Sequence, residues 1–349
     1  MRSYSAWKNS DSSAKRLLSH SMEGSNMQNN PSRHTSGLVS RRSFLRYASG
    51  TAALIAAGMI PVPAFARTDS IKLTILHTND VHSRIDPFPD NDPKYPGLGG
   101  FARRSALLRQ IRSEESYVLL LDAGDIFQGT PYFNLYKGAL ELQLMSEMGY
   151  DAVTIGNHDF DGGIDNLRER IEQDARFPFL NANYELQDTP LNGRVLPYKI
   201  FRRGGLKIGV LGIGIELQGL VDARMYGNAR YLDPVSIAEQ TARRLKHDEK
   251  CDLVIALSHL GYRYKEKKVS DIILAEETSS IDLIIGGHTH TFLDEPVQLS
   301  NKAGKTVHVA QVGWAGIRLG RIDYFFDRDR KKSSLLGGQV KLSDYTIGA

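Results

Sequence analysis

The chain has 349 residues, of which 41% are hydrophobic and 24% are charged, a composition typical of a globular protein with a large core. Its formal net charge of +4 is unevenly spread, because residues 1–66 hold eight of the 44 Lys and Arg but only two of the 40 Asp and Glu, which leaves −2 on the remainder. These values argue against a nucleic-acid-binding protein. The single cysteine, Cys251, excludes an internal disulfide, and no apolar run approaches the ~20 residues of a membrane-spanning helix.

The N-terminal segment has the features of an export signal. Residues 1–36 are rich in Ser, Asn and charge and lack apolar periodicity, which predicts disorder. Ser40–Arg46 contains an arginine pair, a mildly apolar run follows from Ala48 to Ile60, and Ala64-Phe65-Ala66 offers a small-x-small cleavage step. This order resembles a Tat signal and predicts export by the Tat machinery to the periplasm or cell envelope, with a mature chain from near Arg67. The alternative is an arginine pair that happens to precede an apolar core helix.

From Ile71 onward, short β-rich runs alternate with stretches of helical period. The predicted strands are Ile71–His77, Tyr117–Leu121, Ala152–Ile155, Phe177–Asn181, Leu206–Ile213, Asp252–Ser258, Asp282–Ile285, Thr306–Val312 and Gly320–Phe326. The predicted helices are Phe101–Ser113, Gly138–Met148, Ile164–Glu172, Ile237–His247 and Lys265–Glu277. Gly204-Gly205 and Asp188–Gly193 are predicted turns. The alternation predicts one layered α/β domain with much parallel strand pairing.

The chain therefore divides into three predicted parts. Residues 1–66 form a disordered N-terminus and signal peptide, for which Met22 or Met27 is an alternative start. Residues 67–330 form the folded domain. Residues 331–349 form a polar C-terminal tail, which has weak strand character over Leu335–Leu342 and which we expect to be loosely attached.

Five short polar clusters follow predicted strands, where the loops of an α/β fold converge on one crevice. They are Asp80-Val81-His82, Gly124-Asp125, Gly156–Asp161, Ser258-His259 and Gly287–His290. Singly most are weak signals, because a lone Gly-Asp is usually a turn and a Ser-His pair usually a hydrogen-bonded pair. Together they contain five of the ten histidines, and mixed His, Asp and Asn ligands suit Zn, Mn, Fe or Co. So many candidate ligands predict two divalent ions ~3.5–4 Å apart, a known arrangement for hydrolysing phosphate esters.

These clusters and four supporting stretches carry a family resemblance. The stretches are Leu76–Asp80, Gly99–Arg104, Gly124–Gly129 and Gly313–Gly316. From about Ile71 to Phe326 the chain resembles the calcineurin-like metallophosphoesterase superfamily, specifically the catalytic half of the bacterial 5′-nucleotidase family. The resemblance implies a layered α/β/β/α metallophosphoesterase sandwich, with a single catalytic domain over residues 67–330. It also implies a dinuclear-metal hydrolase of nucleotide catabolism, which releases phosphate from nucleotides by attack of a metal-bridging hydroxide.

The resemblance assigns a role to each candidate site residue. It implies that the first metal ion is bound by Asp80, His82 and His290, that Asp125 bridges the two ions, and that the second site is completed by Asn157, His259 and His288. Some relatives have Gln at the position of His290, from which we expect an altered metal preference. His158 and Asp161 resemble the catalytic His–Asp dyad of the family. His158, oriented by Asp161, would stabilise the phosphoryl group and assist the leaving oxygen.

The remaining polar residues of interest favour structural roles. His77 lies inside an apolar strand and is predicted to be a buried hydrogen-bonding residue, while His247 and His308 belong to a helix and a strand. Three arginines could face a phosphate, although such residues more often cover the surface or bridge loops; they are Arg84, Arg103 and Arg104.

The resemblance does not extend to substrate recognition. Full-length members of the 5′-nucleotidase family carry a C-terminal domain that holds the base between aromatic rings, and this sequence ends at Ala349, shortly after the matching region. We therefore expect either a less selective enzyme or a separate partner protein that resembles this C-terminal domain. Two alternatives are a hydrolase of cyclic nucleotides, sugar nucleotides or sulfur esters, and a metal-bearing binding subunit without turnover. The intact His158–Asp161 dyad argues against the binding subunit.

Overall fold

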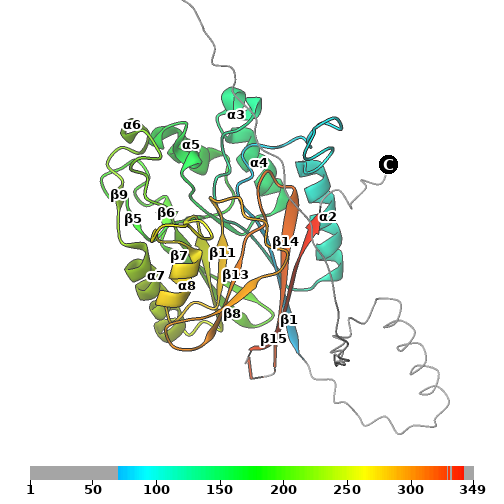
Figure 1. Cartoon of the computed structure of the whole chain (residues 1–349), viewed down its shortest axis with the longest axis vertical. Helices are drawn as coiled ribbons and strands as arrows, with labels where there is room; N and C mark the ends of the chain where they lie inside the picture. Colours follow the sequence, from blue (N-terminus) through cyan, green and yellow to red (C-terminus); the bar gives the residue numbers. More distant parts are fainter. Residues whose placement is uncertain (1–69, 328, 331, 342–349) are drawn as a thin grey trace, which may run out of the picture. The chain divides into compact units, whose positions relative to one another are not determined.

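The computed structural model describes residues 70–327, 329–330 and 332–341, which belong to one compact unit, Ala66–Ala349 (Figure 1). The predicted signal at residues 1–66 lies outside the described residues. In chain order the elements are β1 (Ile71–Thr78), α2 (Phe101–Glu114), β2 (Val118–Asp122), α3 (Pro131–Tyr136), α4 (Ala139–Met148), β3 (Ala152–Thr154), the 3₁₀ turn η1 (His158–Phe160), α5 (Ile164–Gln173), β4 (Phe179–Leu180), β5 (Tyr184–Glu185), β6 (Val195–Leu196), β7 (Tyr198–Arg203), β8 (Leu206–Ile213), α6 (Ala223–Tyr226), β9 (Arg230–Tyr231), α7 (Pro234–Arg243), the π-helical turn η2 (Arg244–Asp248), β10 (Leu253–Ser258), α8 (Asp271–Glu277), β11 (Leu283–Gly286), β12 (Val297–Ser300), β13 (Thr306–Ala310), β14 (Arg318–Phe326) and β15 (Lys332–Lys341).

Two mixed sheets form the centre of the unit. The first has the strand order β15-β14-β1-β2-β3-β4-β6, and the second has the order β12-β13-β11-β10-β8-β7. In the first sheet β1, β2, β3, β4 and β6 run parallel, β14 is antiparallel to β1, and β15 is antiparallel to β14. In the second, β8, β10, β11 and β13 run parallel, and the edge strands β7 and β12 are antiparallel.

Side chains that alternate along the strands create three apolar layers. Leu73 and Ile75 of β1 face the core between the sheets, whereas Leu76 joins the core under α2, α4 and α5. On β10, Leu253 likewise faces the first sheet and Val254 packs under α7 and α8. Figure 1 shows α2 and α4 on one side of the paired sheets and α7 and α8 on the other. The predicted α/β/β/α sandwich is confirmed.

Each predicted strand overlaps an observed strand, whereas β5, β6, β7, β9 and β12 were not predicted, and one helix prediction is half wrong. Lys265–Glu277 is helical only from Asp271, and the preceding charged residues form a loop. Hydrogen bonds hold the residues on either side of this loop: the N–H of Asp271 donates to the carbonyl of Gly261 at 2.8 Å, and the N–H of Tyr262 donates to the side-chain Oγ1 of Thr289 at 2.9 Å. The charged side chains of Lys265–Lys268 offer no apolar stripe that would stabilise a helix there.

Two further comparisons concern turns and the C-terminal segment. The predicted Gly204-Gly205 turn is confirmed: both residues have positive φ, 57° and 80°, and they join β7 and β8 in a hairpin. The expectation of a loosely attached tail is wrong for β15, which pairs with β14 along its length. Leu335 of β15 packs against the core between the sheets. Among the described residues, no helix has the length and apolarity needed to cross a membrane.

Candidate metal centre

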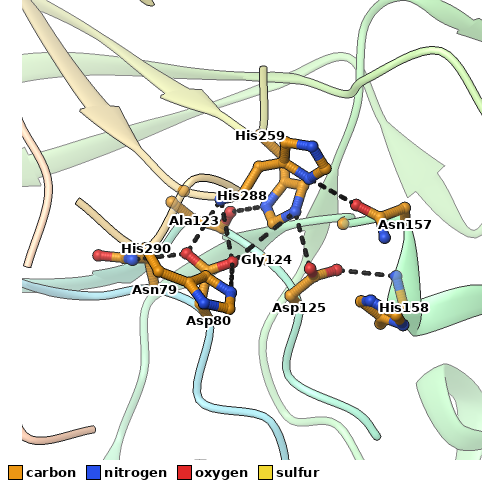
Figure 2. Close-up of polar contacts among 12 residues, drawn as sticks. Asn79, Asp80, Ala123, Gly124, Asp125, Asn157, His158, His259, His288 and His290 are labelled. Carbon is orange, nitrogen blue, oxygen red and sulfur yellow. Dashed lines mark hydrogen bonds and ion pairs between the residues drawn. The ribbon is translucent and has the colours of Figure 1, made fainter. Parts of the chain in front are cut away.

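The predicted ligands converge from the carboxyl ends of five strands. Asp80 follows β1, Asp125 follows β2, Asn157 follows β3, His259 follows β10 and His288 follows β11. Because β1, β2 and β3 belong to one sheet and β10 and β11 to the other, the site lies where the ends of both sheets meet. Figure 2 shows these side chains pointing toward one another.

Two groups of three residues have the geometry of metal sites. The first cluster is Asp80, His82 and His290, and the second cluster is Asp125, His259 and His288; within each, one potential ligand atom per residue lies within 4.8 Å of the others. In the first cluster the Nε2 atoms of His82 and His290 are 3.0 Å apart, and Nε2 of His290 is 3.4 Å from Oδ1 of Asp80. These two imidazole nitrogens are aimed at the same point.

Asp125 belongs to the second cluster and also approaches the first. Its Oδ2 is 3.1 Å from Nε2 of His259 in the second cluster and 3.9 Å from Nε2 of His82 in the first. On the far side of the second cluster, Oδ1 of Asn157 is 2.8 Å from Nδ1 of His288. The structure thus brings the seven predicted ligands together.

Strained backbone positions hold several of these side chains. Five of the seven have positive φ: Asp80 at 50°, His82 at 49°, Asp125 at 55°, His288 at 73° and His290 at 53°. Such left-handed conformations cost about 1–3 kcal/mol each for residues other than glycine, and they persist only where surrounding contacts enforce them. Here the N–H of Asp80 donates to the carbonyl of Gly124 at 2.9 Å, and the N–H of His82 donates to the carbonyl of Asp125 at 3.1 Å.

Close backbone packing makes glycine necessary at two positions between the clusters. A Cβ on Gly124 would lie 2.6 Å from the nitrogen of Gly156, and a Cβ on Gly156 would lie 2.2 Å from Oδ1 of Asp125. Any side chain at either position would displace the Asp125 loop. These contacts explain why Gly precedes the ligand in both the Gly-Asp and the Gly-Asn-His-Asp motif.

Sequence reasoning assigned no role to Asp159, which organises this loop. Its buried carboxylate accepts hydrogen bonds from the backbone N–H groups of Asp125, Ile126, Phe127 and Gly156, at 3.2, 2.9, 3.2 and 2.8 Å. Burial and the nearby Asp125 charge raise the pKa of Asp159 to about 7. In the sequence, the sign of this role was an acidic residue inside a predicted ligand motif. Only the fold shows that the Asp159 carboxylate binds backbone N–H groups and not a metal ion.

Asn79 has a similar supporting role beside the first cluster. Its Nδ2 donates to Oδ2 of Asp80 at 2.6 Å and to the carbonyl of Gly313, while its Oδ1 accepts from the N–H of Val312. The side chain therefore ties Asp80 to the Gly313–Gly316 loop. That loop also carries Trp314, whose indole stacks on the His290 imidazole with centroids 5.5 Å apart and an interplanar angle of 4°.

The donor set fits divalent metal ions. Nδ1 of His259 donates to the carbonyl of Ala123 at 2.6 Å, so Nε2 is the ring nitrogen that remains to bind a metal ion in place of a proton. That buried nitrogen has no well-aligned hydrogen-bond partner among the residues described. A ligand nitrogen fixed in this way, beside carboxylate and amide oxygens, suits a borderline cation such as Zn, Mn, Co or Fe.

The electrostatics of the centre favour positive charge. Burial opposes ionisation of Asp125, but the neighbouring His259 and His82 rings outweigh it and lower the pKa of this carboxyl. Burial likewise opposes the charged form of His259, but the Asp125 carboxylate raises the pKa of His259 to about 10. Burial lowers the pKa of His288 to about 4, so its imidazole is neutral and able to bind a cation.

The predicted dyad lies beside the clusters and is open to solvent. Nδ1 of His158 donates to Oδ2 of Asp161 at 2.8 Å, and the N–H of His158 donates to Oδ1 of Asp125 at 2.8 Å. The hydrogen bond to Asp161 raises the pKa of His158, while burial opposes the rise. The His158 side chain is 37% exposed, so its Nε2 edge is accessible to a bound molecule.

The residues expected to be structural have structural contacts. His77 is buried against Gly320, and burial lowers the pKa of His77 to about 3, but its Nδ1 has no hydrogen-bond partner among the described residues, so the predicted hydrogen bonding is not observed for this atom. Arg104 is fully buried, where it donates to the hydroxyl of Tyr150 at 3.2 Å and lies over the Phe101 ring. Of the other residues expected to be structural, His247 lies in η2 and His308 on β13. The Arg84 guanidinium lies over the Phe88 ring, and Arg103 donates to the carbonyl of Gly97.

Comparison with known proteins agrees with the family resemblance seen in the sequence motifs. Residues 73–292 match the profile of the calcineurin-like phosphoesterase family. The snake venom 5′-nucleotidase of Naja atra is 33% identical over 298 residues, which are 78% of this chain and 54% of that protein. The chain thus spans about half the length of the curated relatives it matches.

Two solved structures resemble the fold. The 5′-nucleotidase precursor of Thermus thermophilus superposes with a TM-score of 0.70 and 30% identity, over 78% of this chain and 54% of that one. The NAD nucleotidase of Haemophilus influenzae superposes with a TM-score of 0.67 and 27% identity, over 76% of this chain and 49% of that one.

Proposed function

This chain belongs to the calcineurin-like phosphoesterase family, and from that premise we propose that it is a metal-dependent phosphoester hydrolase that releases phosphate from nucleotides. The observation that carries the proposal is the pair of three-residue clusters. Asp125 belongs to the second cluster and approaches the first, and the His158–Asp161 dyad lies beside them. The names of its relatives, two 5′-nucleotidases and an NAD nucleotidase, support nucleotides as the substrate class.

We assign a metal ion to each cluster. Asp80, His82 and His290 would hold one ion, Asn157, His259 and His288 the other, with Asp125 shared between them. Two divalent ions in these positions supply a water of lowered pKa and neutralise charge on the phosphoryl oxygens.

The protein's own residues orient the substrate and move the proton. Because Nδ1 of His158 is held by Asp161, its Nε2 is the atom free to reach the leaving oxygen of a bound ester. The raised pKa of His158 keeps a proton on Nε2 at a pH where an ordinary imidazole has lost it. We propose that this proton stabilises the phosphoryl group and is then donated to the leaving oxygen.

The test compares four esters and the metal content of one protein preparation. The full chain is purified, and its Zn, Mn, Co and Fe are quantified. Phosphate release is measured from AMP and an aryl phosphate, and formation of the nucleoside monophosphate is measured from a cyclic nucleotide and a sugar nucleotide. Each assay is run with Mn²⁺ and after chelation. Hydrolysis of AMP that chelation abolishes and Mn²⁺ restores supports the proposal. Two bound ions without hydrolysis of any ester would contradict it and favour a binding protein.

We further propose that residues 1–66 direct Tat export to the periplasm or cell envelope. The support is the sequence order of arginine pair, apolar run and cleavage step. In a host with a Tat system, the processed chain should be found outside the cytoplasm with an N-terminus near Arg67. Replacing both Arg41 and Arg42 by Lys should leave the protein in the cytoplasm, and unchanged export of that variant would contradict the proposal.

A further inference from the structure

One loop supplies a histidine to each metal cluster. It follows β11 and comprises Gly287–Thr291, which we call the histidine loop; His288 belongs to the second cluster and His290 to the first. Both histidines have positive φ, so surrounding contacts must enforce the backbone conformation of this loop. One such contact comes from the first cluster, where the N–H of His288 donates to both carboxylate oxygens of Asp80, at 2.9 and 3.0 Å.

A buried side chain, Gln311, contacts the histidine loop at three points. Its Nε2 donates to the carbonyl of Gly287 at 2.7 Å. Its Oε1 accepts from Oγ1 of Thr289 at 3.1 Å and from the N–H of Thr291. These three residues precede, separate and follow the two histidines in the sequence. The Gln311 amide therefore spans the whole loop.

The second sheet fixes the position of Gln311 itself. The residue directly follows β13, which pairs in parallel with β11, and Figure 1 shows these two strands side by side. Its carbonyl accepts from the N–H of Leu293 at 3.1 Å, and the residue is fully buried. A side chain held in this way has little freedom to move, so it can hold the neighbouring loop in one conformation.

An amide suits this place because of what the loop offers to it. Gly287 presents a carbonyl and Thr291 an N–H, so the group between them must both donate and accept. A carboxylate could only accept, and an ammonium group could only donate. The Thr289 hydroxyl extends the contact, since it donates to Gln311 and accepts from the N–H of Tyr262 at 2.9 Å.

We propose that Gln311 is a positioning residue on which both metal ions depend. The proposal rests on the metal assignment of the proposed function, and it adds a residue that belongs to neither cluster. Trp314 stacks on the ring of His290 alone, whereas Gln311 holds the backbone on both sides of His288 and of His290. Loss of the Gln311 amide should therefore weaken the binding of both ions.

The test measures the two metal affinities of the full chain without turnover. The protein is freed of metal by chelation and titrated with Zn²⁺ by calorimetry, and the visible absorption of the Co²⁺-loaded protein reports the ligand geometry around each ion. Gln311→Met keeps the length of the side chain but removes the amide. We expect both affinities to fall about 10–100-fold, as for loss of a supporting partner, and the Co²⁺ spectrum to change.

Thr289→Val is a second, milder variant, because it removes the hydroxyl that donates to Gln311 and leaves the Gly287 and Thr291 contacts in place. It should weaken both ions about two- to tenfold, as for loss of one neutral hydrogen bond. If thermal unfolding shows that Gln311→Met fails to fold, Thr289→Val decides the question.

Asn301→Leu is the matched control. Asn301 is another buried amide that holds a loop, because its Oδ1 accepts from the N–H groups of Ala303 and Lys305 and its Nδ2 donates to the carbonyl of Ser279. It lies at the opposite end of β13 from Gln311. Its loss should lower the thermal stability of the metal-free protein without changing either metal affinity.

Three results would overturn the positioning role and leave the hydrolase function standing. They are weakening of one ion only, unchanged affinities in the folded variants, and an equal loss of affinity in Asn301→Leu. If Gln311→Met weakens both ions but the wild type hydrolyses no ester, the hydrolase function fails while the positioning role of Gln311 stands.

Discussion

Each metal cluster has two buried ligands and one partly buried ligand, but His259 and His290 are held in different ways. In the second cluster the side chains of His259 and Asp125 are 0% and 2% exposed, and the His259 ring is fixed by the carbonyl of Ala123. In the first cluster the His290 side chain is 39% exposed, and its ring is held by stacking on Trp314. The buried His259 is thus positioned by a backbone carbonyl, whereas the more exposed His290 is positioned by the neighbouring Trp314 side chain.

This difference predicts unequal behaviour of the two ions. A ligand fixed by buried hydrogen bonds has little freedom to lose, so the ion held by His259 should depend strongly on that residue. A ligand fixed by ring stacking near the surface can adjust, so the ion held by His290 should depend less on that residue. Asp125 belongs to both environments, because it lies 3.1 Å from His259 and 3.9 Å from His82.

Asp125→Asn should have the largest effect, because it removes the charge that both clusters share. We expect kcat/KM for AMP to fall by at least about 10³-fold, the upper range for loss of one preorganised electrostatic group. Metal analysis should find fewer than two ions per chain. Asp294→Asn is the control, because Asp294 is 88% exposed in a surface ion pair. Two retained ions together with near-normal activity would show that Asp125 does not connect the clusters.

His158→Asn should separate chemistry from metal binding. We expect both ions to remain and kcat to fall by about 10²–10⁴-fold, the usual contribution of a general acid. Because the Asp161 hydrogen bond raises the pKa of His158, the wild type should keep full activity below that pKa and lose it as the pH rises through it. This alkaline limb should be absent from the variant, and His247→Asn should retain it. A variant with wild-type turnover would exclude the acid role.

A matched pair of substitutions tests the difference between the clusters directly. His259→Gln should weaken one ion by more than about 100-fold, since loss of even a supporting partner commonly costs 10–100-fold. His290→Gln replaces the exposed ligand by an amide that can still reach the metal, and about tenfold weaker binding with a changed metal preference is expected. Isothermal titration with Zn²⁺ and Mn²⁺ measures both. Equal losses of metal affinity in the two variants would mean that the burial of a ligand does not determine how strongly metal binding depends on it.

The sequence predicted nine of the fifteen described strands and the ligand set, because these depend on local patterns. Apolar runs bounded by Gly and Asp mark strands that end in polar loops, as at β1 and β2. The short strands β5 and β9 have two residues each and pair only across a long loop, so no local period marked them. The pairing of these two strands was therefore not predicted from the sequence.

The supporting residues were missed for a different reason. Asp159 and Trp314 both lie inside motifs that we singled out, yet their partners are far away in the chain or belong to the backbone. Asp159 looks like a further metal ligand until its four N–H contacts are seen. Trp314 resembles ordinary core packing until its parallel stack on His290 is seen. Residue type alone does not distinguish binding a metal from holding a ligand in place.

Trp314→Leu should have the smallest effect and should act on the first cluster alone. Removing the indole deletes a ring contact worth about 0.5–1.5 kcal/mol, which corresponds to a two- to tenfold loss of affinity for one ion. The chain has only two tryptophans, Trp7 and Trp314, so in a Trp7→Phe background the emission of Trp314 should change as Mn²⁺ fills the first cluster. Titration of this signal measures the affinity in the background chain.

Trp314→Phe is the matched control, because it keeps an aromatic ring over His290 and should restore near-normal affinity when metal is titrated by calorimetry. His290→Gln in the Trp7→Phe background should abolish most of the fluorescence response, since the indole then no longer stacks on a ligand. If Trp314→Leu weakened both ions equally, its role would be general loop packing. If Trp314→Leu weakened the binding of one ion only, the position of His290 would depend on the stacked Trp314 ring, as the comparison of His290 with His259 predicts.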